Sequence, residues 1–239
     1  ISTQAGCSMA CSFCASARGG LIRNLTAGEM LSQVYVIGRD SAQRVDNIVM
    51  MGSGEPLENY DSAIAFLNLA TDEETINISK RSITLSTCGI ADKIYDLADS
   101  DIGINLSVSL HNALQAERED IMPAAKIYPI EQLLKACSYY IEKTKRRVTF
   151  EYALIEGKND SEFHAYELIK KIKDLICLVN LIPVNENKGT DIKRSNEDNI
   201  KNFYDILAKN NINTTIRRTL GSSINAACGQ LRAEVYKEE

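Results

Sequence analysis

Short apolar runs alternate along the chain with longer stretches of helical periodicity. The runs are rich in β-branched residues, as strands are, and lie at residues 47–52, 82–87, 103–110, 147–155, 177–183 and 213–218. Four segments carry apolar residues at spacings of three and four, which predicts helices after Thr26 and over residues 130–143, 163–174 and 195–209. Glu29 completes a capping box with Thr26, and Ser195 and Asp198 take capping positions before the last helix.

This alternation predicts the fold class. Strands that alternate with helices pair in parallel through right-handed crossovers. Strands that are apolar throughout are covered on both faces. Five or six such units indicate an α/β fold, a partial (β/α)6 barrel of the TIM type, and we expect one domain over residues 1–239.

The ends of the expected strands carry the candidate chemistry. Ligands of parallel sheets bind at the carboxyl ends of the strands. The residues that follow the strands are small, polar or rich in glycine: Cys7, Cys11 and Cys14 after a first strand, then "GSGEP" (52–56), "STCG" (86–89), "SLHN" (109–112) and "IPVN" (182–185). We expect these segments to build one pocket.

Composition restricts the class of protein. The chain is 44% hydrophobic and 25% charged, as soluble globular proteins are. It has neither an apolar run of about 18 residues nor a signal-peptide pattern, so we expect a cytoplasmic protein without a membrane span. Seven unevenly spread cysteines argue against a disulfide framework. The net charge of −5 disfavours a non-specific nucleic-acid binder.

The three clustered cysteines indicate a soft metal centre. A structural zinc ion would need a fourth ligand, which only His111 or a distant cysteine supplies. Three ligands on a four-iron cluster instead leave one iron open. The Cys-x-x-x-Cys-x-x-Cys spacing, with aromatic Phe13 before the last cysteine, resembles the radical S-adenosylmethionine (SAM) enzymes. The resemblance implies a [4Fe-4S] cluster on Cys7, Cys11 and Cys14 that cleaves SAM to a 5′-deoxyadenosyl radical.

The loop after the second strand supports a SAM site. Gly52 and Gly54 let the backbone approach a ligand, and the carbonyls and Glu55 accept hydrogen bonds from an ammonium group. In this context Gly54 and Glu55 resemble the superfamily's contact with the SAM amino group. The resemblance further implies that SAM contacts Ser86, Ser109, Leu110, His111 and Asn185. Each of these residues also has a purely structural interpretation. The loop 52–56 would be a plain turn, Ser86 would cap a helix, and His111 would bind no ligand.

Motifs over the whole chain resemble the RlmN/Cfr family. They are "RNLT" (23–26), "GEPL" (54–57), "KRSITLST" (80–87), "SLH" (109–111), "NLIPVN" (180–185) and "ACGQL" (227–231). The resemblance implies methylation of an adenosine of 23S rRNA, and for RlmN types also of adenosine 37 of tRNA. Pro56, after the glutamate, resembles RlmN, which methylates carbon 2, more than Cfr, which methylates carbon 8 and confers antibiotic resistance.

The family's chemistry implies a role for Cys228. Carbon 2 of adenine has no nucleophilic lone pair, so direct methyl transfer from SAM fails. In the family one SAM methylates the cysteine that matches Cys228. The radical from a second SAM takes a hydrogen from this methyl group, and the methylene radical adds to adenine. A second cysteine then resolves the adduct by forming a disulfide.

That second cysteine precedes the position of Ile1 in the family, as does an accessory RNA-binding domain. We therefore expect this chain to bind the cluster and SAM but to turn over poorly. We expect a monomer with a flavodoxin-like or ferredoxin-like electron donor. Candidate RNA contacts are the basic runs at 80–81, 143–147, 193–194 and 217–218, which are also typical of solvated faces.

Two other classes of protein remain open. A zinc-binding RNA module would have no open metal position. A radical SAM enzyme with a different substrate would have no role for Cys228. Cys137 and Cys177 read as core residues, whereas Cys88, at a strand end, has a possible place in the pocket.

Overall fold

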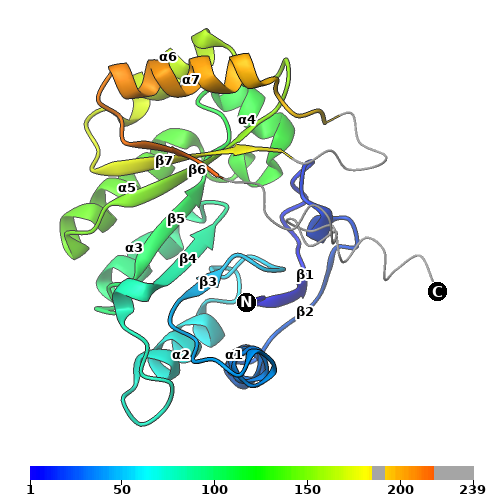
Figure 1. The fold of residues 1–239 in the computed structure, drawn as a ribbon, viewed down its shortest axis with the longest axis vertical. Coiled ribbons are helices and arrows are strands. Elements are labelled where there is room, and N and C mark those ends of the chain that lie inside the picture. Colours follow the sequence, from blue (N-terminus) through cyan, green and yellow to red (C-terminus); the bar gives the residue numbers. More distant parts are fainter. Residues whose placement is uncertain (185–191, 218–239) are drawn as a thin grey trace.

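Six parallel strands form the central sheet of the computed structural model, which describes residues 1–184 and 192–217. They follow one another in chain order across the sheet (Figure 1): β3 (Ile48–Met50), β4 (Ile83–Thr87), β5 (Asn105–Ser109), β6 (Val148–Leu154), β7 (Cys177–Pro183) and β8 (Thr214–Ile216). Each of the six strand runs expected from the sequence is confirmed. The result is an α/β fold with a partial barrel.

Helices connect the strands of the sheet. They are α1 (Ala27–Ser41), α2 (Tyr60–Thr71), α3 (Ala91–Asp99), α4 (Gln115–Ile121), α5 (Ile130–Thr144), α6 (Glu162–Ile172) and α7 (Glu197–Lys209). Short 3-10 turns add Ala15–Ala17, Lys80–Ser82 and Pro123–Lys126. Helices α3 and α5 pack together along one face of the sheet, and α6 and α7 pack together beside β7 (Figure 1).

Helix starts follow local hydrogen bonding. The capping box of α1 is confirmed, because Thr26 accepts from the Glu29 backbone and the Glu29 side chain accepts from the Thr26 backbone. The expected cap of α7 is wrong by one residue. Asn196 caps this helix, and its Oδ1 accepts the Asn199 N–H at 2.8 Å. Ser195 is buried, and its hydroxyl has no hydrogen-bond partner among the described residues.

The strand before the cysteines stands apart from the parallel sheet. β1 (Gln4–Gly6) pairs antiparallel with β2 (Leu21–Asn24), and the cysteine loop connects the two. This hairpin lies across from α3 and α5, on the other side of the sheet (Figure 1). The Asn59 amide fixes it by donating to the carbonyls of Thr3 at 2.9 Å and Leu25 at 2.7 Å. The cysteine loop is thereby held over the open side of the barrel.

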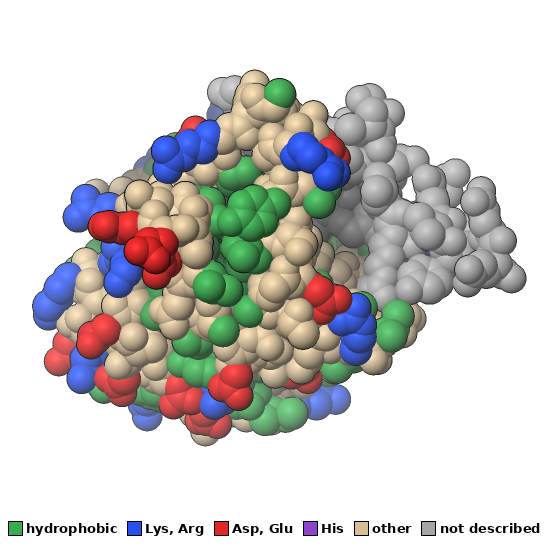
Figure 2. Space-filling model, turned by 90° about the horizontal axis from the view of Figure 1, so that it is seen from below, with side chains coloured by type: hydrophobic (Ala, Val, Ile, Leu, Met, Phe, Trp, Pro, Cys, Tyr) green, Lys and Arg blue, Asp and Glu red, His purple; other side chains and the backbone are tan. Residues whose placement is uncertain are grey.

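One outer face exposes apolar side chains. Seen from below Figure 1, where α1 and α2 lie, a band of apolar side chains crosses the surface between charged groups (Figure 2). The exposed large apolar residues of α1 and β3 are Tyr35, Val36, Ile37 and Val49. Within the described ranges, none of the helices is both long and apolar enough to cross a membrane.

Candidate functional site

The cysteine loop is fixed at both ends and in its middle. The Cys7 N–H donates to the Gly20 carbonyl at 3.0 Å, and the Cys14 N–H closes a turn on the Cys11 carbonyl at 3.1 Å. Gly6 has φ +92°, and a Cβ there would lie 2.0 Å from the Gly20 carbonyl oxygen. Glycine is therefore required where the two arms of the loop cross.

The three thiols form one electrostatic group. All three are free. Burial raises the pKa of Cys7 to about 11 and the pKa of Cys11 to about 12, and Cys14 also raises the pKa of both. At neutral pH these thiols hold their protons, and binding of a metal centre would release them.

The donor set fits an iron–sulfur cluster. Among the described residues, no three His, Cys, Asp or Glu side chains are arranged to share one metal ion. In a four-iron cluster each cysteine ligates its own iron, so the sulfur atoms stand farther apart than the ligands of a single ion. Cys7, Cys11 and Cys14 are free thiols on one loop, and they would hold the cluster.

Glu55 is an internal anchor of the loop after β3. Its side chain is buried, and its two oxygens accept the backbone N–H groups of Leu57 at 3.0 Å and Cys88 at 2.6 Å. Its own N–H donates to the Gln4 side chain at 2.8 Å. Burial raises the pKa of Glu55, and the backbone donors oppose this rise. Through its carboxylate Glu55 thus ties the loop after β3 to the end of β4, and through its backbone N–H it ties this loop to β1.

Gly52 and Gly54 allow a close approach of the chain to itself. A Cβ at Gly52 would lie 2.7 Å from the Ile1 carbonyl oxygen, and one at Gly54 would lie 2.7 Å from the Gln4 nitrogen. Gly54 also has φ +103°, which disfavours any side chain. The close neighbour at these positions is therefore the start of the chain.

The expected SAM-contact residues of β4 and β5 gather at one edge of the sheet. Ser86 lies in β4, and Ser109 ends the adjacent parallel strand β5. Both are half-buried, whereas the Leu110 side chain is buried. The N–H groups of Leu110 and His111 donate to the Glu151 carbonyl at 3.0 and 3.2 Å. Hydrogen bonds to β6 thus fix the direction of this segment.

His111 is a buried neutral imidazole. Its Nδ1 accepts the Ala153 N–H at 3.0 Å, so the ring proton lies on Nε2. Burial, with a smaller effect of Arg118, lowers the pKa of His111 to about 3. The ring packs edge-on against Phe13 of the cysteine loop, with centroids 4.6 Å apart. His111 is therefore a hydrogen-bond donor beside the expected cluster site.

Two buried residues of this region escaped the sequence analysis. Glu151 accepts hydrogen bonds from Ser107 and Asn180, each at 2.7 Å, and joins β5, β6 and β7. Arg118 of α4 donates to carbonyls at the ends of β4 and β5. The sequence did carry a signal for each: Glu151 is a charged residue inside an apolar strand, and Arg118 is a charged residue shortly after "SLHN". Asn185 and Cys228 lie outside the described residues.

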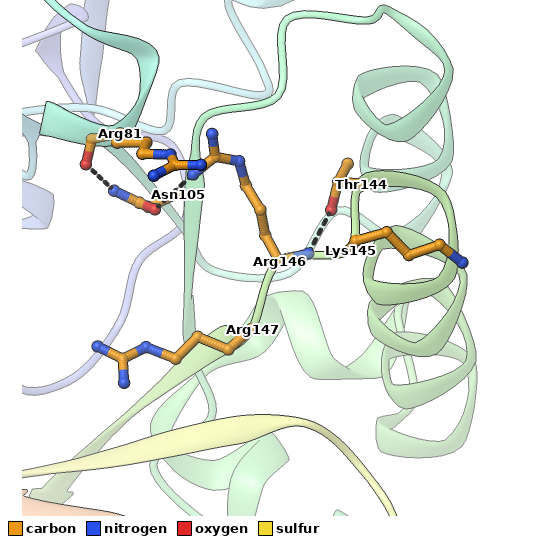
Figure 3. Close-up of a pocket in the computed structure, with 6 residues that line it drawn as sticks. All are labelled: Arg81, Asn105, Thr144, Lys145, Arg146 and Arg147. Atoms are coloured by element: carbon orange, nitrogen blue, oxygen red, sulfur yellow. Dashed lines mark hydrogen bonds between the residues drawn. The ribbon is translucent and has the colours of Figure 1, made fainter.

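A basic pocket lies at the opposite edge of the sheet. Its cavity of ≈ 380 Å³ is lined by Arg81, Asn105, Thr144, Lys145, Arg146 and Arg147 (Figure 3). Asn105 donates to the Arg81 carbonyl at 2.7 Å and accepts from Arg146 at 3.3 Å, while Lys145 extends away from them (Figure 3). None of the four cations pairs with a carboxylate in the described part of the chain. Two basic runs far apart in sequence thus meet.

Comparisons with known proteins place the chain in a family. The Radical SAM superfamily matches residues 1–169. A protein of Clostridium tetani, "Probable dual-specificity RNA methyltransferase RlmN", is 52% identical over 99% of this chain and 68% of its own length. A protein of Clostridium botulinum strain Hall, with the same name, is 53% identical over 97% of this chain and 68% of its own length.

Solved structures agree with these matches. A radical SAM methyltransferase from Sphaerobacter thermophilus has a TM-score of 0.93 and 42% identity, over 96% of this chain and 68% of that one. SuiB of Streptococcus suis, bound to S-adenosylmethionine, has a TM-score of 0.67 at 18% identity and shares the fold. A [4Fe-4S] cluster and SAM, the expected cofactors, are those of the superfamily. The chain belongs to the radical SAM superfamily and, within it, to the RlmN family.

Proposed function

We propose that this chain is the radical SAM core of an RNA methyltransferase. Its product would be an adenosine methylated at carbon 2, in 23S rRNA and at position 37 of tRNA. The observation that carries the proposal is the group of three free thiols on one loop over the open barrel, in a chain 52% identical to a protein named as an RNA methyltransferase.

The described residues have distinct roles in this proposal. Cys7, Cys11 and Cys14 hold the cluster, which supplies the electron for reductive cleavage of SAM. The loop 52–56 binds the amino group of SAM through its carbonyls, since the Glu55 oxygens already accept backbone N–H groups. Ser86, the segment 109–111 and Asn185 complete the SAM site. The neutral His111 contributes a donor at Nε2.

Cys228 is proposed as the methyl carrier. Transfer of a methyl carbon to an aromatic C–H carbon needs a carbon radical. In the family's chemistry this radical forms on the methyl group of an S-methylated cysteine. This role separates the proposal from a radical SAM enzyme with another substrate. Pro56 favours carbon 2 over the carbon-8 chemistry of Cfr types.

We further propose that RNA is the partner and that the basic pocket contacts its backbone. Support comes from Arg81, Arg146 and Arg147, which line one cavity and form no ion pair within the described ranges, in a chain with net charge −5. Guanidinium groups bind phosphate oxygens in a bidentate manner. We also propose that the protein is a monomer in the cytoplasm and that a flavodoxin-like or ferredoxin-like donor reduces its cluster.

Peptide mass spectrometry on Cys228 tests the function. The chain is expressed with iron and with a relative's N-terminal segment added before Ile1, and the peptide 219–232 is analysed. One added methyl group on Cys228, absent from the Cys11→Ala variant, is expected. An unmodified Cys228 in protein with a full cluster and SAM would contradict the methyltransferase assignment.

A further inference from the structure

Arg118 is a buried cation without a carboxylate partner. It is fully buried in α4, and it forms no ion pair with any described residue. An arginine stays protonated in proteins, so the positive charge persists inside the fold. A buried charge is costly unless a counter-charge or a full set of hydrogen bonds offsets its lost hydration.

The guanidinium binds the ends of two neighbouring strands. Its Nε donates to the Leu110 carbonyl at 3.0 Å, and its Nη2 donates to the carbonyls of Cys88 at 2.9 Å and Ser109 at 3.3 Å. Ser109 is the last residue of β5, and Cys88 and Leu110 directly follow β4 and β5. One planar side chain therefore fixes the spacing between two loops of the proposed SAM site.

The same short helix also holds the cysteine loop. The Ile121 carbonyl, one turn after Arg118, accepts the Ser12 N–H at 3.0 Å. Ser12 lies between Cys11 and Cys14. A third loop of the site is thus attached to α4, and the cysteines keep a fixed position relative to the guanidinium.

Arg118 brings a positive charge to the place where the cysteine loop is attached. Cys88, whose carbonyl accepts from the guanidinium, also donates its N–H to Glu55 of the neighbouring loop. Among the described residues no carboxylate forms an ion pair with Arg118. An anionic group bound at the cysteines would therefore supply a counter-charge on the loop that α4 holds.

We propose that Arg118 is the buried counter-charge of the cluster and the positioning residue for the β4 and β5 loops that bind SAM. A four-iron cluster on three thiolates is anionic, and one-electron reduction adds a further negative charge. A fixed cation nearby favours the reduced state. This inference rests on the proposed cluster and SAM sites.

Two substitutions separate the two roles. Arg118→Lys keeps the charge, but an ammonium group lacks the fork that reaches three carbonyls on two strands. Arg118→Gln removes the charge and keeps a partial donor. Arg39→Gln is the matched control, since Arg39 is exposed near the end of α1. Each protein is reconstituted with iron and sulfide, checked for folding by circular dichroism, and examined in two ways.

The first measurement is the midpoint potential of the cluster without SAM, and the second is the dissociation constant for SAM. Arg118→Gln should shift the potential to a more negative value, while Arg118→Lys and Arg39→Gln keep the wild-type potential. Both Arg118 variants should bind SAM at least tenfold more weakly than wild type. If Arg118→Gln fails to fold, Arg118→Lys alone still tests positioning, and Arg118→Met at the same site tests the potential.

Two results would overturn the inference. A charge-removing variant with the wild-type potential would exclude the counter-charge, and wild-type SAM affinity in Arg118→Lys would exclude positioning. A wild-type protein that takes up no cluster would instead contradict the proposed function. The two failures are therefore distinguishable.

Discussion

The backbone N–H of Cys88 donates a hydrogen bond of 2.6 Å to the buried carboxylate of Glu55. Glu55 lies in the loop after β3 and Cys88 at the end of β4, so this bond joins two neighbouring ligand loops. The other carboxylate oxygen accepts the Leu57 N–H at 3.0 Å. One side chain from the "GSGEP" segment thus supports the carboxyl edge of the sheet from inside.

Glu55→Gln should lower the free energy of unfolding by about 1–3 kcal/mol. The amide keeps one acceptor oxygen but turns an NH₂ group toward a backbone donor, which leaves a buried N–H unpaired. Urea denaturation of the purified chain measures the change. Glu73→Gln, at an exposed loop position, is the control and should change it by less than about 0.5 kcal/mol. Equal stabilities of wild type and Glu55→Gln would contradict the anchoring role.

Gly54→Ala should destabilise the fold and weaken SAM binding. Its Cβ would lie 2.5 Å from the Gln4 Cβ, on a backbone with φ +103°. Steric overlap with the first strand forces the loop to move, at a cost of about 1–3 kcal/mol. Gly28→Ala is the control, because its Cβ meets nothing closer than 4.0 Å and alanine favours the helix.

Thermal unfolding compares the two glycine variants. We expect a lower midpoint for Gly54→Ala and an unchanged or higher midpoint for Gly28→Ala. A Gly54→Ala protein as stable as wild type would mean that the start of the chain does not pack against this loop.

Periodicity in the sequence predicted the strands well and the helices in part. Thr26 and Glu29 marked the start of α1 because a capping box is a local signal. Helix α2 was not predicted, although its buried residues Ala63, Phe66, Leu67 and Ala70 have the spacing of a helix face. The predicted cap of α7 was wrong, because Ser195 is buried and Asn196 caps the helix instead.

The sequence predicted which strand ends form the site, but it did not predict the hydrogen bonds that connect them. Motif positions indicated that Cys11, Glu55 and His111 share one edge of the sheet. Tertiary packing decides that Glu55 accepts a backbone N–H from the end of β4. It also decides that the Arg118 side chain reaches the carbonyl of Cys88. Neither contact can be read from a motif. The antiparallel pairing of β1 with β2 also could not be read from an apolar pattern, since every residue of β2 is exposed.

His111 should make stability depend on pH. Its pKa falls from 6.5 to about 3 in the folded chain, so below pH 6.5 the unfolded chain binds more protons than the folded chain. Stability is therefore full above pH 6.5 and falls as the pH drops toward 3. Wild type should lose up to about 2 kcal/mol relative to His111→Asn between pH 7 and pH 5.

Denaturation at both pH values measures this difference. The chain has two histidines, so His164→Asn is the matched control and should retain the loss. A stability difference between wild type and His111→Asn that is the same at pH 7 and pH 5 would contradict the buried, neutral state of His111.

Cys11→Ala should abolish cluster binding and leave the fold intact. Cys11 is half-buried in the loop between β1 and β2, outside the fully buried core. Cys137→Ala is the control, since Cys137 lies on the buried face of α5. This variant should keep the cluster and lose about 1 kcal/mol of stability. Iron and sulfide analysis after anaerobic reconstitution gives the answer. Full iron content in Cys11→Ala would exclude this cysteine as a ligand.

Deuterium transfer tests the methyl-carrier radical chemistry most directly. The chain, with a relative's N-terminal segment added before Ile1, is expressed in cells supplied with methionine that carries a trideuterated methyl group, so that any methyl group on Cys228 is labelled. It is then reduced in the presence of SAM with the same label. The 5′-deoxyadenosine formed is then analysed by mass spectrometry. If the radical takes a hydrogen from a methyl group on Cys228, the product carries one deuterium in wild type and none in Cys228→Ala. Unlabelled 5′-deoxyadenosine from wild type, or none at all, would contradict a radical SAM methyltransferase that works through Cys228.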